Sequence, residues 1–220
     1  FKKIQKISKI KKLKIFSIND KKNNFQILSH FFKGESQILK IKHNNLIKNV
    51  NINLIGKIQL KNILMAIIAA KKSNIDLNKI LLTIPKLKSV EGRFEKIGKI
   101  KNKSKVILDY AHTPEALKTC LLNLKEQFPG KKISLLFGCG GNRDQNKRSK
   151  MGKIVSNFAD SIILTNDNPR FENPQKIRRD IKKGIKKKRI IEIANRAIAI
   201  KQAIHNLNSG DILLVAGKGH

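Results

Sequence analysis

The sequence contains no tryptophan, one tyrosine and only 5% aromatic residues. Proteins that hold single-stranded nucleic acid stack the bases on aromatic side chains, and this chain is poorly supplied with them. Zinc-finger and RNP-type signatures are also missing. This scarcity argues against nucleic acid as a partner.

Acidic residues are scarce as well. The chain has 15 aspartates and glutamates against 48 lysines and arginines, which gives a net charge of +33. Such a charge ordinarily favours nucleic acid or an anionic membrane, because binding releases counterions. The lysines, however, are spread from Lys2 to Lys218 and occur with abundant isoleucine and asparagine, as AT-rich codons would produce. We interpret the charge as compositional drift on a solvated surface; a basic nucleic-acid-binding protein is the weaker alternative.

Cysteine and long apolar runs are the remaining absences. Cys120 and Cys139 form neither a CxxC pair nor a disulfide framework, which is typical of a reducing cytoplasm. The longest strongly apolar run, residues 63–70, is far below the roughly twenty residues that cross a bilayer. We expect a cytoplasmic monomer without membrane span or signal peptide. Because the chain starts at Phe1 and stops at His220 directly after a strand-like segment, we also expect a piece of a longer protein.

The first part of the chain predicts short strands followed by helices. The β-prone stretches are residues 14–18, 25–32 and 37–42, separated by polar turns. Apolar positions at helical spacing follow over residues 60–72 and 77–83, and Pro85 breaks the pattern. A domain boundary is expected near Ser89.

After that boundary, strands and helices alternate. The predicted strands are residues 105–108, 133–137, 161–165, 190–193 and 211–215, and the predicted helices are 114–126, 147–158, 174–183 and 194–206. Continuous apolar strands with intervening helices predict an α/β fold: a doubly wound, mostly parallel sheet with a Rossmann-like architecture. The glycine run 138–141 is no GxGxxG fingerprint, so this fold alone gives no function.

Polar residues follow three of the predicted strands, where ligands bind in open α/β sheets. The first group, residues 109–114, offers the Asp109 carboxylate to a ribose or metal and His112 to a base or phosphate. Thr113 and Pro114 suit the start of a helix. The alternative is a structural turn in which Asp109 makes an Asx-type hydrogen bond and His112 is a surface residue.

The second and third groups each contain an arginine. Residues 138–144 join glycines, which allow close backbone approach, to Arg143, which can bind a carboxylate in bidentate fashion. Residues 166–170 end in Arg170. A solvated loop and an ordinary turn are the respective alternatives. In a lysine-dominated chain, arginine at motif positions 93, 143, 148 and 170 is informative, although arginines 178, 179, 189 and 196 occur outside any motif.

Taken in order, these segments resemble the diaminopimelate-adding members of the Mur ligase family. The resemblance rests on residues 91–95 (EGRFE), 109–114 (DYAHTP), 137–144 (FGCGGNRD), 167–170 (DNPR) and 216–220 (AGKGH). It implies that residues 1–89 are the remnant of a central ATPase α/β domain and residues 90–220 a C-terminal domain truncated at its end.

The resemblance also implies a reaction. Such an enzyme uses ATP and Mg²⁺ to phosphorylate the terminal carboxylate of UDP-N-acetylmuramoyl-L-alanyl-D-glutamate, and the amino group of meso-diaminopimelate then attacks the acyl-phosphate. Arg93 and Asp109 are the implied catalytic residues, and the implied nucleotide contacts are Asn62, Arg93, Asp109 and His112. The implied amino-acid contacts are Arg143, Asp167, Asn168, Arg170 and Gly217. No metal ligand is implied within the chain.

The chain departs from the family pattern in several places. Ile58 and Gln59 replace an aromatic residue and an asparagine in the segment that ends at Asn62, and Asn142 stands where aspartate is common. A GxxxxGK[ST] phosphate loop does not occur in the sequence. We therefore expect this chain to be inactive alone. Another ligase of the same superfamily, of the folylpolyglutamate type, and a decayed non-catalytic product are the alternatives.

Overall fold

The computed structural model describes residues 7–11, 25–43, 46–98, 100, 103–186 and 188–218. The chain divides into two compact units, residues 1–88 and 89–220. The predicted strand at 14–18 lies outside the described residues. Within the described residues, no helix is long and apolar enough to cross a membrane.

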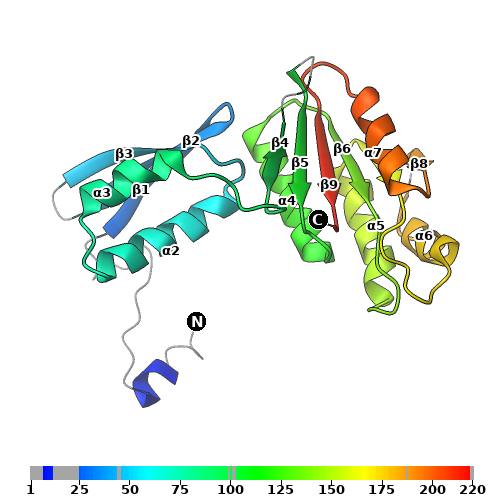
Figure 1. The fold of residues 1–220 in the computed structure, drawn as a ribbon, viewed down its shortest axis with the longest axis horizontal. Coiled ribbons are helices and arrows are strands. Elements are labelled where there is room, and N and C mark those ends of the chain that lie inside the picture. Colours follow the sequence, from blue (N-terminus) through cyan, green and yellow to red (C-terminus); the bar gives the residue numbers. More distant parts are fainter. Residues whose placement is uncertain are drawn as a thin grey trace. The chain divides into compact units, whose positions relative to one another are not determined.

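The first unit is a three-stranded antiparallel sheet with helices packed on it (Figure 1). Its elements are β1 (Phe25–Lys33), β2 (Ser36–His43), β3 (Leu46–Ile52), α2 (Ile58–Lys72), α3 (Leu77–Thr83) and the 3-10 turn η1 (Ile84–Lys86). Alternate residues of β2 and β3, among them Leu39 and Val50, form one core with Ile63 and Ile67 of α2. β2 and β3 bury alternate side chains because the face of the sheet that packs on α2 is apolar.

The second unit is a six-stranded sheet in the order β4-β5-β9-β6-β7-β8. Its strands are β4 (Glu95–Ile97), β5 (Lys105–Asp109), β6 (Ile133–Phe137), β7 (Ser161–Leu164), β8 (Ile190–Glu192) and β9 (Ile212–Ala216). Its helices are α4 (Pro114–Gln127), α5 (Asn146–Phe158), α6 (Pro174–Lys182) and α7 (Arg196–His205). All pairs are parallel except β4 with β5.

Helices cover both faces of this sheet. Val106, Leu136 and Leu213 pack with Ala199 and Ala203 of α7. The neighbouring strand residues Ile107, Leu135 and Leu214 point to the opposite face and are also fully buried. There α4 lies against β6 and α5, and α5 lies against α6. The predicted doubly wound, parallel-rich fold is confirmed.

The turns after the strands are set by local sequence. Thr113 caps α4 by accepting a hydrogen bond from the Ala116 amide, and Pro114 occupies the first turn. The side chains of Asn173 and Asn195 cap α6 and α7 in the same way. These caps fix where each strand-to-helix connection ends, and so place the polar residues at the carboxyl edge of the sheet.

Candidate functional site

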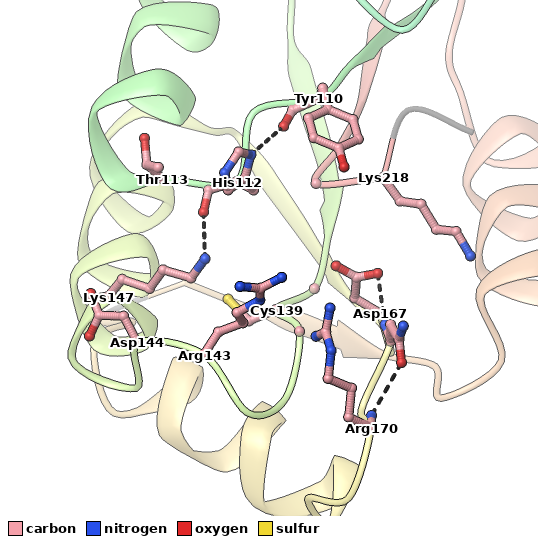
Figure 2. A pocket seen from close by; sticks show the side chains of 14 residues that line it. Tyr110, His112, Thr113, Cys139, Arg143, Asp144, Lys147, Asp167, Arg170 and Lys218 are labelled. Carbon is pink, nitrogen blue, oxygen red and sulfur yellow. Dashed lines mark hydrogen bonds between the residues drawn. The ribbon is translucent and has the colours of Figure 1, made fainter.

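A pocket of about 850 Å³ opens at the carboxyl ends of β5, β6, β7 and β9 (Figure 2). The residues that line it come from the loops after these four strands and, for Lys147, from the first turn of α5: Tyr110, His112, Thr113, Gly138, Cys139, Gly140, Arg143, Asp144, Lys147, Asp167, Asn168, Arg170, Gly217 and Lys218. This is the position in which ligands bind in open parallel sheets.

Glycines allow the loop after β6 to lie directly against the loop after β7. A Cβ at Gly138 would stand 2.4 Å from the Thr165 carbonyl oxygen, and one at Gly141 would stand 1.9 Å from that of Pro169. Such distances are not tolerated, so only glycine fits. The Gly141 amide donates to Asn168 O at 2.8 Å, which joins the two loops into one rim.

Arg170 lies in the loop after β7 and connects it to the loop after β6. Its backbone is left-handed, with φ +49°, and its amide donates to Asn168 Oδ1 at 3.2 Å. Its Nη1 donates to Gly141 O at 2.7 Å. Figure 2 shows the guanidinium groups of Arg143 and Arg170 and the Asp167 carboxylate all directed toward the pocket. A guanidinium anchored by one nitrogen keeps donors for a carboxylate.

Behind this rim lies an ion-pair cluster built around a buried arginine. The Arg148 side chain, on α5, is fully buried; its Nη2 lies 2.9 Å from Glu172 Oε1 and its Nη1 lies 3.3 Å from Asp180 Oδ2. Hydrogen bonds from Arg148 and from the Asn142 amide hold the pKa of Glu172 below its usual value. Lys183 and Arg148 lower the pKa of Asp180. Arg148 thus ties the loop after β7 to α5 and α6.

The opposite wall of the pocket comes from the loop after β5. Lys147 Nζ donates to His112 O at 2.9 Å, and His112 Nδ1 lies 3.0 Å from Tyr110 O. The Tyr110 and His112 rings meet edge to face, with centroids 5.4 Å apart. The Arg93 guanidinium lies over the Tyr110 ring, 5.1 Å from its centroid. Cationic groups therefore border this wall too.

Asp109 lies beside the pocket and does not line it. Its Oδ2 accepts from the Phe94 amide and its Oδ1 from the Ala111 amide, both at 2.8 Å, and the Cys120 thiol lies 3.3 Å from Oδ1. The contact to Ala111 is the Asx-type hydrogen bond of the structural alternative. Asp109 thereby fixes the segment that carries Arg93 against the end of β5.

The pocket brings together most of the residues that the sequence nominated. His112, Arg143, Asp167, Asn168, Arg170 and Gly217 all line it. Arg93 and Asp109 stand at its border. Asn62 lies in the first unit, exposed on α2 with its Nδ2 3.4 Å from Gln59 Oε1.

Several contributors were not nominated. Lys147, next to the motif 137–144, and Lys218, within the motif 216–220, line the pocket, and only these places in the sequence could have indicated it. The buried residue Arg178 carries no such signal. Arg178 bonds to Asn166 Oδ1, next to Asp167, and its Nε lies 2.6 Å from Glu192 Oε1. A buried arginine is recognised only when its partners are known.

The composition of the pocket defines what it can hold. Its walls carry the cations of Arg143, Lys147, Arg170 and Lys218 and the carboxylates of Asp144 and Asp167. An excess of cations with some acidic groups fits a ligand that has carboxylates and also an ammonium group. Burial raises the pKa of the Cys139 thiol to about 11, so it is neutral at pH 7 and no nucleophile. No group of three His, Cys, Asp or Glu residues suited to a metal occurs in the described part of the chain.

Comparison with known proteins identifies the family of the part of the chain that carries the pocket. Residues 92–219 match the family model described as "Mur ligase, glutamate ligase domain". The chain belongs to the Mur ligase family. The matched range contains the whole pocket.

Individual Mur ligases are similar over most of the chain. The UDP-N-acetylmuramoyl-L-alanyl-D-glutamate–2,6-diaminopimelate ligase of Rickettsia prowazekii is 40% identical over 210 residues, which cover 90% of this chain and 43% of the relative. A solved structure of a ligase with the same name is 32% identical, with a TM-score of 0.69, over 99% of this chain and 45% of that one. The folylpolyglutamate synthase of Mycobacterium tuberculosis has a TM-score of 0.76 at 16% identity, over 98% of this chain and 49% of that one, and shows the fold alone. The chain spans about two fifths of the length of the curated relatives it matches.

Proposed function

We propose that this chain supplies the amino-acid pocket of an ATP-dependent ligase that joins meso-diaminopimelate to UDP-N-acetylmuramoyl-L-alanyl-D-glutamate during peptidoglycan synthesis. The observation that carries the proposal is the convergence of Arg143, Arg170 and Asp167 on one pocket. The similarity to ligases of that name supports the same substrates.

The amino acid explains the charges of the pocket. meso-Diaminopimelate carries two carboxylates and two amino groups. Arg143 and Arg170 suit the carboxylates, and Asp167 and Asn168 supply acceptors for an ammonium group. L-Lysine lacks the second carboxylate and would leave Arg170 facing a cation.

The arrangement of the second unit supports its assignment, over residues 90–220, as the C-terminal domain of the ligase. Residues 1–89 are assigned to the end of the central ATPase domain. Free buried cysteines at positions 120 and 139 suit the cytoplasm. We propose that the protein acts there as a monomer, without nucleic acid or membrane as a partner.

The nucleotide contacts are proposed at the wall formed by the loop after β5. Arg93 and His112 offer a cation and an imidazole for phosphate or base, and Asp109 holds the Arg93 segment. Asn62, in the first unit, is proposed as a nucleotide contact from the family resemblance alone. These groups fit ATP only in part, because the sequence has no phosphate loop. The described residues offer no metal cluster, so they do not by themselves fit Mg²⁺.

The pocket contributes positioning to the reaction. The amine nitrogen of the bound amino acid forms a bond to the carbonyl carbon of the acyl-phosphate, phosphate leaves and the amine loses a proton. Arg143 and Arg170 would fix the carboxylates, so that the amine is presented in one orientation. ATP, when bound, supplies the phosphoryl group that activates the substrate carboxylate.

Substrate competition in a full-length ligase that carries this sequence tests the proposal. We expect phosphate release and product formation with meso-diaminopimelate, ATP, Mg²⁺ and the UDP-linked dipeptide, and little or none with L-lysine. Equal use of L-lysine would refute the amino-acid assignment. Activity with glutamate and a folate in place of these substrates would place the protein with the folylpolyglutamate ligases.

A further inference from the structure

Arg196 belongs to no motif, yet its side chain contacts Ala216, the residue before the pocket residue Gly217. It is the first residue of α7, on the face of the sheet opposite to α4. A cation in the first turn of a helix is unfavourable, because the positive end of the helix dipole lies there. α7 has no acidic residue in this turn. Helix stability therefore does not explain an arginine at this position.

One hydrogen bond connects Arg196 to the pocket. Its Nη2 donates to Ala216 O, the last residue of β9, at 3.0 Å. The next residue, Gly217, lines the pocket in a left-handed conformation with φ +94°. A Cβ at Gly217 would stand 3.3 Å from Gly138 O, so β9 ends tightly against the loop after β6. Arg196 thus holds the peptide that leads into this wall.

The other terminal nitrogen of Arg196, Nη1, does not contribute to this hydrogen bond. Nη1 is buried and has no hydrogen-bond partner among the described residues. Burial lowers the pKa of Arg196, and the nearby Asp167 carboxylate opposes that effect. The two segments are joined, because the Asn166 amide donates to Ala194 O at 3.2 Å. A buried donor without a protein partner is uncommon and calls for an explanation.

We propose that Arg196 is a positioning residue for the amino-acid pocket: its guanidinium fixes the end of β9 through Ala216 and helps to orient the Asp167 side chain on the neighbouring segment toward the ligand. This role deepens the proposed function and rests on it. Arg196 does not line the pocket, so it acts through Gly217 and Asp167 and does not touch the ligand.

Steady-state kinetics of a series of variants in a full-length ligase carrying this sequence test the role. Arg196→Ala loses both the donor and the charge, Arg196→Gln keeps a donor for Ala216, and Arg196→Lys keeps the charge and one donor. We expect the KM for meso-diaminopimelate to rise in the order Lys, Gln, Ala, reaching about tenfold or more for Ala. The KM for ATP should stay within about twofold. Arg179→Ala, an exposed arginine of α6, is the matched control and should change neither constant.

A double-mutant cycle separates positioning from general stability. If Arg196 acts through Asp167, Arg196→Gln should add little to the KM effect of Asp167→Asn. A lower melting temperature with an unchanged KM for meso-diaminopimelate, or equal increases for both substrates, would overturn the proposal. Should Arg196→Ala not fold, the Lys and Gln variants decide by the same criteria. A parent ligase that does not use meso-diaminopimelate would instead refute the proposed function.

Discussion

The guanidinium of Arg170 has two roles: one nitrogen donates to the protein backbone, and the other donors are available to a ligand in the pocket. Nη1 is committed to Gly141 O, while the left-handed backbone turns the remaining donors inward. An arginine can serve both sides because its nitrogens lie in one rigid plane. A lysine ammonium at the same place could keep the contact to Gly141 or reach the ligand, with a single point of attachment.

Arg170→Lys is therefore expected to weaken the binding of the amino acid and to leave nucleotide binding nearly unchanged. Loss of a bidentate carboxylate contact costs about 1.5–3 kcal/mol, roughly tenfold to a hundredfold in the KM for meso-diaminopimelate. The KM for ATP should barely change. Kinetics with each substrate varied in turn measure this, with Arg179→Lys as control. Equal losses for both substrates would assign Arg170 to the fold or to the nucleotide.

At this scale, sequence reasoning reached the residues that stand directly after strands. Arg143, Asp167 and Arg170 were nominated because strand ends can be located from apolar runs. Arg178 and Arg196 were not, and the structural role of Arg148 was not foreseen, because a buried arginine depends on partners far away in the sequence. Arg148 pairs with Glu172 and Asp180, 24 and 32 residues away. Asp109 illustrates a further limit: its position at a strand end suggests a ligand contact, but its carboxylate accepts hydrogen bonds from the backbone amides of Phe94 and Ala111.

Among the elements, the strands and helices of the second unit were predicted to within two residues of their ends. Continuous apolar strands and caps such as Thr113 and Asn173 made this possible. The antiparallel edge strand β4 was missed because its three residues, Glu95 to Ile97, have too little apolar pattern to read. The third strand of the first unit, β3, was not identified either, since its exposed leucine and isoleucine obscure the alternation.

The contact between α5, α6 and the loop after β7 should make stability depend on pH. The pKa values of Glu172 and Asp180 are lowered in the folded state, so their contribution is complete above the ordinary carboxyl pKa and is lost as pH falls through the folded values. We expect the free energy of unfolding to decrease between about pH 5 and pH 3.

Urea unfolding at a series of pH values measures this dependence. Arg148→Met should be less stable at pH 7 and should show a shallower decrease, because the carboxylates have lost their shared partner. Arg179→Met should keep the slope of the parent. A slope that is the same in Arg148→Met and the parent would place the pH dependence elsewhere.

For the molecule as a whole, we expect the 220-residue chain to hydrolyse no ATP and to form no amide bond. Phosphoryl transfer needs a backbone cradle and a lysine on the phosphates, and the sequence contains no phosphate loop. Weak binding of meso-diaminopimelate should remain, because its proposed pocket lies within one unit. Phosphate release with all substrates, compared with an Arg93→Ala, Asp109→Ala double variant, measures this. Turnover above that variant would reveal an ATP site within these residues.

The order of the strands has a consequence for synthesis. Of the strands that the structure describes, β9 is made last, yet it lies between β5 and β6, which pair with it and not with each other. About 100 residues separate β5 from β9, so a ribosome adding about 5–20 residues per second needs roughly 5–20 s to deliver it. During that interval the inner edges of both strands are unpaired, and such edges invite aggregation. The chain is thus most exposed to chaperones and proteases just before the strand that completes its pocket emerges.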